Sequence, residues 1–334
     1  MASIDTSFDF KGMSACRLDA DKYSCIIVPS MGGLVVRMTD NKMGLEFFKY
    51  REEATIAQMN EARCLWGLPT LYLPNRFDKG VLKTSDAVYQ LPINEPLLDN
   101  FIHGWVHDRE HEIVLAEADD ERAVLTTKYV FDEKDEMFKY IPLSFVLTYT
   151  FTLSARGLEH KVTLESLADK KLPVSICTHT CFNAPMTVGG KQDTMRLEVP
   201  VEKTCVLNER FLPTEELPPL DENGKLYKSG EMVPVLHDIN NHMYTGCDTT
   251  LDGEKFHGCI VTDTETGARI CNEVSKEYRF WNMWNDSGVN GYFCPEPMTA
   301  MINSPNLSLP YEVSGYCEIS KGEKYTCTQR FFSL

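Results

Sequence analysis

A period-two alternation of apolar and polar side chains constrains the fold of this chain more than any other feature of its sequence. In residues 143–153, LSFVLTYTFTL, every odd position is apolar, while the even positions are a serine, a valine and three threonines. Successive side chains of a strand point to opposite faces, so this pattern predicts a strand with one buried face. Residues 158–164, LEHKVTL, alternate in the same way, and Ala155-Arg156-Gly157 supplies a turn between the two segments.

Short strand signals recur along the chain, with Gly, Pro, Asn and Asp between them. This spacing favours an all-β fold, a large antiparallel β-sandwich, and we expect one domain over residues 1–334. Helical patterns are confined to 51–63 and, more weakly, 95–101, and the proline-rich stretch 208–234, with a turn at Asn223-Gly224, is interpreted as a loop. Further strands are expected at 23–28, 34–39, 112–117, 123–131, 195–201, 268–274, 311–319 and 324–332.

Composition excludes several classes of function. The formal net charge of −16 leaves no basic surface for a nucleic acid, and favours a small neutral or cationic partner. Residues 1–15 lack the pattern of a signal peptide, and no apolar run approaches the ~20 residues that cross a bilayer, so we expect a cytoplasmic protein that does not bind membranes. The twelve cysteines are scattered without CxxC spacing, which predicts free, mostly buried thiols.

Residues 291–297, GYFCPEP, present one carboxylate between two prolines. Proline fixes its own φ and biases the preceding residue towards an extended conformation. Glu296 is therefore expected to be held stiffly at the end of a strand that stops at Pro295. An exposed turn glutamate is the alternative interpretation.

Residues 176–185, ICTHTCFNAP, place His179 between Cys177 and Cys181 on one face of an expected strand. Alternate positions of a strand are about 6–7 Å apart, too far for three ligands to reach one zinc ion at ~2.0–2.3 Å. We therefore expect no metal, and His179 is either a core histidine or a catalytic imidazole.

Two more segments are rich in groups that bind ligands. The segment 74–80, PNRFDKG, places Asn75 and Arg76 on a turn, where a surface salt bridge with Asp78 is the alternative. In 280–286, FWNMWND, Trp284 is either core or an apolar platform for a sugar ring.

A third such segment, 101–112, FIHGWVHDREHE, contains three histidines. His103 stands apart from the others because it follows an apolar residue and precedes a glycine. His107 and His111 lie among charged residues, which suggests a solvated turn.

Taken in order, these segments resemble the aldose 1-epimerase (galactose mutarotase-like) family, from the Gly32-Gly33 pair to the C-terminus. PNRFDKG resembles the family's turn that contains Asn-Arg, and FIHGWVHDREHEI resembles its HG segment. THTCFN is similar to the family's NHSYFN motif, and YFCPEP resembles its strand that ends in Glu-Pro. ISKGE resembles its Pro-Gly-Glu turn.

The resemblance implies a large antiparallel β-sandwich that interconverts the α and β anomers of a hexose without cofactor or metal. Carried over residue by residue, Glu296 would be the catalytic base and His179 the catalytic acid. His103 and Arg76 would hold sugar hydroxyls.

Further substrate-binding candidates are Asn75, Trp284 and Asp238. Asp238 would stand for an aspartate that the family uses to bind sugar hydroxyls, although Asn241 lies nearer the expected position. Cys181 also departs from the family pattern, which often has an aromatic residue there.

The chemistry of anomerisation fits this assignment. A base takes the proton of the anomeric hydroxyl and an acid protonates the ring oxygen, and a glutamate and a histidine can hold these opposite roles near neutral pH. Three alternatives remain open: a non-catalytic carbohydrate-binding protein, a hexose-phosphate epimerase, and a zinc hydrolase built on Cys177, His179 and Cys181. No oligomeric state is indicated.

Overall fold

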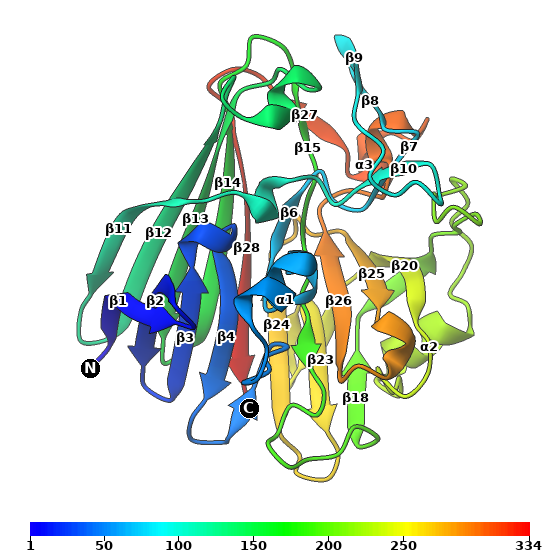
Figure 1. Cartoon of the computed structure of the whole chain (residues 1–334). Helices are drawn as coiled ribbons and strands as arrows, with labels where there is room; N and C mark the ends of the chain where they lie inside the picture. Colours follow the sequence, from blue (N-terminus) through cyan, green and yellow to red (C-terminus); the bar gives the residue numbers. More distant parts are fainter.

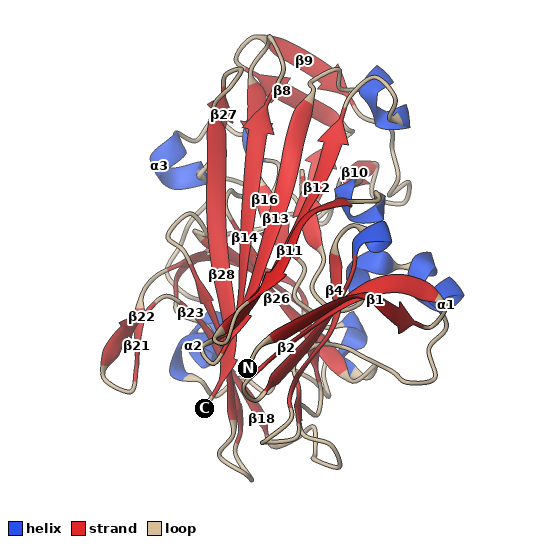
Figure 2. Ribbon diagram, turned by 90° about the vertical axis from the view of Figure 1, so that its left-hand side faces the viewer, coloured by secondary structure: helices blue, strands red, loops and turns tan.

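The computed structural model describes residues 1–334 and confirms an antiparallel β-sandwich (Figures 1 and 2). One layer is an eight-stranded sheet, and a five-stranded and a seven-stranded sheet make up the other layer (Figure 1). Isolated bridges between Val35 and Leu68 and between Phe48 and Phe182 join the latter two sheets.

The eight-stranded sheet contains the longest strands, several of which run side by side in Figure 2. In spatial order it consists of β11 (Glu112–Ala118), β12 (Arg122–Phe131), β13 (Phe145–Ser154), β14 (Gly157–Ser166), β28 (Lys324–Ser333), β24 (Arg269–Val274), β23 (Gly258–Asp263) and β18 (Met195–Glu198).

The opposite layer begins with a five-stranded meander, which comprises β1 (Ser3–Phe10), β2 (Met13–Ala20), β3 (Tyr23–Val28), β4 (Leu34–Asp40) and β5 (Leu45–Glu46). Its β2 contacts β12 and β13 across the interior. The seven-stranded sheet comprises β19 (Val201–Thr204), β20 (Asn240–Gly246), β25 (Phe280–Trp284), β26 (Tyr292–Met298), β16 (Ile176–Thr178) and β6 (Thr70–Tyr72), with β17 (Phe182–Asn183) also paired to β26.

Four two-stranded ribbons and short helices complete the molecule. The ribbons are β7 (Arg76–Asp78) with β10 (Asn100–Ile102), β8 (Val81–Thr84) with β9 (Ala87–Gln90), β15 (Leu172–Val174) with β27 (Cys317–Ile319), and β21 (Thr249–Leu251) with β22 (Glu254–Phe256). The α-helices are α1 (Ile56–Glu61), α2 (Glu222–Ser229) and α3 (Tyr311–Ser314). The 3-10 turns are η1 (Pro29–Met31), η2 (Arg63–Leu65), η3 (Val106–Asp108), η4 (Glu136–Lys139), η5 (Asp286–Gly288) and η6 (Ser304–Asn306). None of the helices combines the length and the apolar character that crossing a membrane requires.

The hairpin predicted from the alternating segments is confirmed as β13 and β14. Burial alternates residue by residue along β13, and the two strands pair without a bulge from Phe145 opposite Ser166 to Ser154 opposite Gly157. Gly157 has a φ of +100°, and a Cβ there would lie 2.0 Å from the carbonyl oxygen of Phe331. Glycine is therefore required at this turn because the neighbouring strand passes directly beside it.

The main core is a cluster of 64 buried residues between the layers, and four smaller clusters accompany it. The odd-numbered apolar residues of β13 contribute to it, including Tyr149 and Phe151. Each such side chain stabilises the fold by about 1.5–3 kcal/mol through removal of apolar surface from water. The apolar side chains of the alternating segment therefore face the core, as predicted.

Several element predictions are wrong. Residues 95–101 form a turn that leads into β10 rather than a helix. The expected strand 195–201 is interrupted at Val199 and Pro200, and 311–319 begins as the helix α3. Pro200 cannot supply a ladder donor, which explains the first interruption, and Gly315 ends α3 in the left-handed conformation with a φ of 72°.

The stretch 208–234, interpreted as a loop, contains the helix α2. The side chain of Asp221 accepts a 2.7 Å hydrogen bond from the N–H of Gly224, and Gly230 ends the helix in the left-handed conformation with a φ of 71°. These two caps outweigh the turn propensity of Asn223-Gly224. The helix predicted within 51–63 is confirmed as α1, which is shorter than expected.

Candidate active site

A cavity of about 220 Å³ opens beside β26, β7 and the segment that joins β16 to β17. It contains all but one of the residues that the sequence assigned to the site. Its lining consists of Cys64, Leu65, Asn75, Arg76, Ile102, His103, His179, Asn241, Trp284 and Glu296.

Glu296 lies within β26 rather than at its end, which corrects the prediction that the strand stops at Pro295. On one side β26 pairs continuously with β25, with Asn282 opposite Glu296. On the other side it pairs with β17 at Phe293 and with β16 only at Met298. Both prolines fall in the interval between these partners, where the strand needs no backbone donor.

The carboxylate of Glu296 is almost completely enclosed, with 1% of the residue exposed. Asn282 donates a 3.3 Å hydrogen bond to its Oε1, and the Sγ of Cys177 lies 4.0 Å from its Oε2. Burial raises the pKa of Glu296, and the nearby charge of His179 lowers that pKa without cancelling the effect of burial. The group is thus a carboxylate with a stronger affinity for a proton than an exposed glutamate has.

His179 is fixed between two partners of opposite chemistry. Its Nε2 lies 3.5 Å from Oε1 of Glu296, and its Nδ1 lies 3.6 Å from the Sγ of Cys181. Burial lowers the pKa of His179, but the charge of Glu296 and the contact with Cys181 together raise it to about 9. At neutral pH the imidazole therefore carries a proton that it can give away.

His103 faces the same cavity from a strained turn. Its φ is 66°, and its N–H donates to the carbonyl oxygen of Asn75 at 2.9 Å. Gly104 follows with a φ of +64°, where a Cβ would lie 1.9 Å from the carbonyl oxygen of Tyr72. Burial, followed by the charge of His179, lowers the pKa of His103 well below its usual range. His103 is therefore neutral, and its buried Nδ1 has no hydrogen-bond partner in the protein.

Arg76 is held in one orientation by a two-point ion pair. Its Nε and Nη2 contact the carboxylate of Glu95 at 3.0 and 2.9 Å. Its Nη1 donates to the side-chain oxygens of Asn75 at 3.2 Å and Asn241 at 3.1 Å. The alternative of a surface salt bridge with Asp78 is wrong, since Asp78 pairs with Arg210 at 2.6 Å.

The sequence interpretation missed Glu95, Asn241 and Asn282 as parts of this network. Glu95 lies in a segment that was predicted to be helical, and Asn241 was noted as nearer the expected position but was passed over in favour of Asp238. Asp238 is exposed and does not line the cavity, whereas Asn241 does, at a φ of 56°. Asparagine tolerates this left-handed conformation better than most residues, which is the one local signal that could have pointed to it.

Trp284 forms the apolar part of the wall at the end of β25. Its ring centroid lies 6.0 Å from that of His179 at an angle of 71°, and 6.1 Å from that of Tyr292. One face of a half-buried indole beside polar hydrogen-bonding groups is typical of a surface on which a sugar ring packs.

The interpretation of His107 and His111 as part of a solvated turn is wrong. His111 is buried and stacks on Tyr149, with ring centroids 4.6 Å apart, and its Nδ1 lies 3.2 Å from the hydroxyl of Thr127. Burial lowers the pKa of His111 to about 3. His107 is also largely enclosed, with 11% of its side chain exposed. Neither residue lines the cavity.

The thiols around His179 are arranged differently from the expected strand. Cys177 lies towards Glu296, whereas Cys181 lies against Cys294, with the two sulfur atoms 3.4 Å apart. The donor atoms of His179, Cys181 and Cys294 all fall within 4.8 Å of one another, so a soft metal ion would find three ligands here. All twelve cysteines are free.

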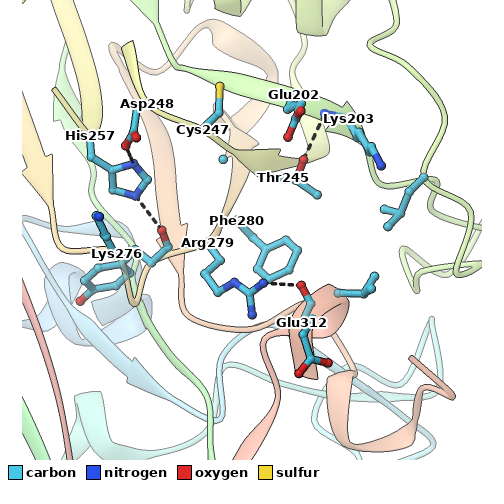
Figure 3. Close-up of a pocket in the computed structure, with 14 residues that line it drawn as sticks. Glu202, Lys203, Thr245, Cys247, Asp248, His257, Lys276, Arg279, Phe280 and Glu312 are labelled. Atoms are coloured by element: carbon cyan, nitrogen blue, oxygen red, sulfur yellow. Dashed lines mark hydrogen bonds and ion pairs between the residues drawn. The ribbon is translucent and has the colours of Figure 1, made fainter. Parts of the chain in front are cut away.

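A second cavity, of about 510 Å³, shares no lining residue with this site, and Figure 3 shows it in close-up. His257 there is held between Asp248, 3.1 Å from its Nδ1, and the carbonyl oxygen of Tyr278, 3.0 Å from its Nε2. Arg279 is likewise engaged by the carbonyl oxygens of Tyr311 and Glu312. His257 and Arg279 therefore already have protein partners.

Comparisons with known proteins agree with the fold. The family model described as aldose 1-epimerase matches residues 14–331. A galactose mutarotase-like protein from Clostridium acetobutylicum is 27% identical, covers 99% of this chain and 98% of its own, and superposes with a TM-score of 0.96. A galactose 1-epimerase from Lactobacillus acidophilus is 14% identical, covers 100% and 98% of the two chains, and has a TM-score of 0.73. The protein LacX of Lactococcus lactis is 22% identical over 67% of this chain and 72% of its own.

Proposed function

The chain belongs to the aldose 1-epimerase family, and from this premise we propose that it interconverts the α and β anomers of a hexose. The observation that carries the proposal is the pair formed by Glu296 and His179, whose oxygen and nitrogen lie 3.5 Å apart at the wall of a cavity. A carboxylate and a protonated imidazole beside a bound sugar supply both proton transfers that ring opening requires.

In the proposed reaction, Glu296 takes the proton of the anomeric hydroxyl while His179 gives its proton to the ring oxygen. The bond between the anomeric carbon and the ring oxygen breaks, and the open aldehyde rotates about the adjacent carbon–carbon bond. In ring closure, His179 recovers the proton from the attacking hydroxyl and Glu296 returns its proton to the new anomeric oxygen. Both groups end in their starting states, and no electrons leave the sugar.

The remaining lining residues orient the sugar. The guanidinium of Arg76 and the side chains of Asn75 and Asn241 present hydrogen-bonding groups along one side, and His103 adds an unpartnered nitrogen. Trp284 supplies the apolar surface. We assign to Asn241 the hydroxyl-binding role that the sequence had given to Asp238. Because these groups hold a neutral polyol by hydrogen bonds, each mismatch in hydroxyl configuration leaves a buried polar group unpaired.

The proposal favours a neutral sugar over a sugar phosphate. The lining cations are Arg76 and the imidazolium of His179, and they are already paired with Glu95 and Glu296, respectively. A phosphate in this cavity would also lie near the carboxylate of Glu296. The alternative of a purely sugar-binding protein is disfavoured because binding does not require a buried carboxylate against a protonated imidazole.

Polarimetry of freshly dissolved sugars tests the proposal. The wild-type protein is expected to accelerate mutarotation of at least one neutral hexose. Glu296→Gln should lower kcat by roughly 100-fold or more, because the amide cannot accept the proton. Sugar affinity, measured by calorimetry, should change far less, and His179→Asn should behave in the same way.

Glu165→Gln is the matched control, because Glu165 pairs with Lys324 on the eight-stranded sheet and does not line the cavity. This variant should retain wild-type rates. A Glu296→Gln protein with near-wild-type kcat would show that the base lies elsewhere. Acceleration of no sugar at all, with sugar still bound, would favour the carbohydrate-binding alternative.

A further inference from the structure

Cys181 and Cys294 meet on the side of His179 that faces away from Glu296. The two Sγ atoms are 3.4 Å apart, and Cys181 Sγ also lies 3.6 Å from Nδ1 of His179. We propose that Cys181 and Cys294 form a reversible disulfide when the protein meets a small peroxide, and that this bond lowers the activity of the cavity. The second half of this proposal rests on the proposed function, whereas the first half does not.

The strand register places the two cysteines directly opposite each other. In the pairing of β17 with β26, Phe182 is opposite Phe293 and Asn183 is opposite Tyr292. Continuing this antiparallel register by one residue brings Cys181 opposite Cys294. Opposite residues on antiparallel strands project their side chains from the same face, so the sulfur contact follows from the backbone and not from an unusual rotamer.

The backbone also has a spacing that suits a disulfide. The N–H of Cys181 donates to the carbonyl oxygen of Gly67 at 3.1 Å, and its carbonyl oxygen accepts from the N–H of Lys49 at 2.7 Å. Both groups point away from β26, so Cys181 and Cys294 form a non-hydrogen-bonded pair. Such pairs have Cα atoms about 4.5 Å apart, at the short end of the range that disulfides span.

The two thiols differ in character, as an attacking and a resolving cysteine must. Burial raises the pKa of Cys181, but the hydrogen bond from Cys294 and the contact with His179 lower it to about 6. The ammonium of Lys49, 3.8 Å from the ring centroid of Tyr292, adds a further positive charge. Burial raises the pKa of Cys294, which stays a thiol. Cys181 is therefore the thiolate nucleophile.

The chemistry balances with one molecule of hydrogen peroxide. The thiolate of Cys181 attacks one peroxide oxygen, which breaks the O–O bond, forms a sulfenic acid and releases hydroxide. The sulfur of Cys294 then attacks the sulfur of Cys181, the S–O bond breaks, and the Cys294 proton leaves with the departing oxygen as water. The two sulfur atoms lose two electrons, which the peroxide accepts.

Access restricts the oxidant to small molecules. Both cysteines are buried, but Cys181 Sγ lies 3.6 Å from the carbonyl oxygen of Cys64, and Cys64 and His179 line the cavity. The sulfur is therefore in contact with two residues of the cavity wall. A peroxide is small enough to pass, whereas glutathione disulfide is not.

Disulfide formation would remove the anionic partner of His179. A disulfide sulfur carries no charge and is a weak acceptor, so the imidazolium would keep Glu296 alone as counter-ion. A metal ion fits the same three donors less well, because it would lie beside the ammonium of Lys49.

Peptide mapping after oxidation tests the site directly. Reduced, desalted protein is treated with hydrogen peroxide, its remaining thiols are alkylated under denaturing conditions, and the digest is analysed by mass spectrometry. We expect a linked pair of peptides that contain Cys181 and Cys294, and its loss on treatment with dithiothreitol. Linkage of other cysteines, or no linkage under oxidant excess, would overturn the proposal.

Variants of two cysteines test whether the linkage is specific to Cys181 and Cys294. Cys294→Ser, with Cys294→Ala as a second version in case serine disturbs the core, should form no linked peptide. Cys259→Ser removes another buried thiol, on β23, and should leave the Cys181–Cys294 linkage intact.

For each protein, the epimerisation rate of the oxidised sample is divided by the rate of the reduced sample. The wild-type ratio should fall at least tenfold and recover with dithiothreitol. A linked wild-type protein with an unchanged rate would overturn the regulatory half alone. A protein that epimerises no sugar but forms the link would contradict the proposed function and leave the disulfide site standing.

Discussion

Nε2 of His179 lies 3.5 Å from Oε1 of Glu296, and both side chains are buried. Charges enclosed in this way are stable only as a pair, because each loses its hydration. The packing that buries the two side chains in the seven-stranded sheet therefore also holds the base and the acid together for the proton transfers that we propose.

The activity should follow a bell-shaped pH profile. As pH falls, protonation of Glu296 removes the base, and since burial raises its pKa, kcat/KM should decline at a pH above the usual 4.5 of a glutamate. As pH rises, deprotonation of His179 removes the acid, so the alkaline decline should centre near pH 9. A pH series of polarimetric kcat/KM values checks both limbs. An alkaline limb near pH 6.5 would contradict the stabilisation of the imidazolium.

Glu296 should also control the titration of His179 in the absence of sugar. Burial is the largest influence on the pKa of His179 and lowers it, while the charge of Glu296 is the main influence that raises it. In Glu296→Gln the raising charge is gone, so the midpoint should move below 9. NMR titration of the His179 ring resonances measures it. Glu165→Gln, away from the cavity, should leave the midpoint in place.

Glu95→Gln should raise KM with little change in kcat. The carboxylate holds Arg76 at two points, and an amide cannot accept from both guanidinium nitrogens. We expect an increase in KM of about tenfold, equivalent to ~1.4 kcal/mol. Steady-state polarimetry with the best hexose provides the measurement.

Glu273→Gln is the control for that variant, since Glu273 accepts from Nε and Nη2 of Arg330 through one carboxylate oxygen on the eight-stranded sheet and does not line the cavity. It should not change KM. An equal loss of kcat and kcat/KM in Glu95→Gln would instead indicate a role in the proton transfers.

A neutral hexose should be a better substrate than its 6-phosphate. The lining offers one guanidinium, already paired with Glu95, and the net charge of the chain is −16. Comparison of kcat/KM for glucose or galactose with kcat/KM for glucose 6-phosphate tests whether the neutral sugar is the better substrate. A preference of tenfold or more for the phosphate would contradict the proposal.

The cysteines should react according to their burial. In the native protein Cys64, Cys247 and Cys317, which are half-buried, should react first with a thiol reagent. In denaturant without reductant nearly all twelve should react. Several protected pairs in freshly purified protein would indicate stable disulfides.

Gly157→Ala should destabilise the fold more than Gly12→Ala. Both glycines have positive φ, +100° and +85°, so each alanine should cost about 1–2 kcal/mol through backbone strain. A Cβ at Gly157 would also meet the carbonyl oxygen of Phe331 at 2.0 Å, whereas nothing lies within 4 Å of a Cβ at Gly12. Urea unfolding midpoints of the two variants should therefore differ, and equal midpoints would contradict this account of the turn.

The strands and the sandwich could be predicted because their signals are local. Residues 143–153 alternate since successive side chains of any strand point to opposite faces, and the structure confirms β13 with every odd side chain in the core. Gly, Pro, Asn and Asp marked the strand ends, because the tendency of these residues to form turns is also a property of the local sequence. Prediction was poorer where local signals compete, as at α2, where the caps Asp221 and Gly230 outweigh Asn223-Gly224.

The motifs singled out Glu296, His179, His103 and Arg76, which line one cavity, but the contacts between these residues and their partners depend on tertiary structure. Asn282 faces Glu296 because β25 and β26 pair in one register, and Glu95 reaches Arg76 from a separate turn. Asp238 is exposed and Asn241 lines the cavity, although only a few residues separate them. The sequence by itself determined which side chains alternate and which segments carry polar groups, since those are properties of neighbouring residues. Only the tertiary structure decided which groups lose their water together and meet within hydrogen-bonding distance, since burial and pairing depend on strands that are distant along the chain.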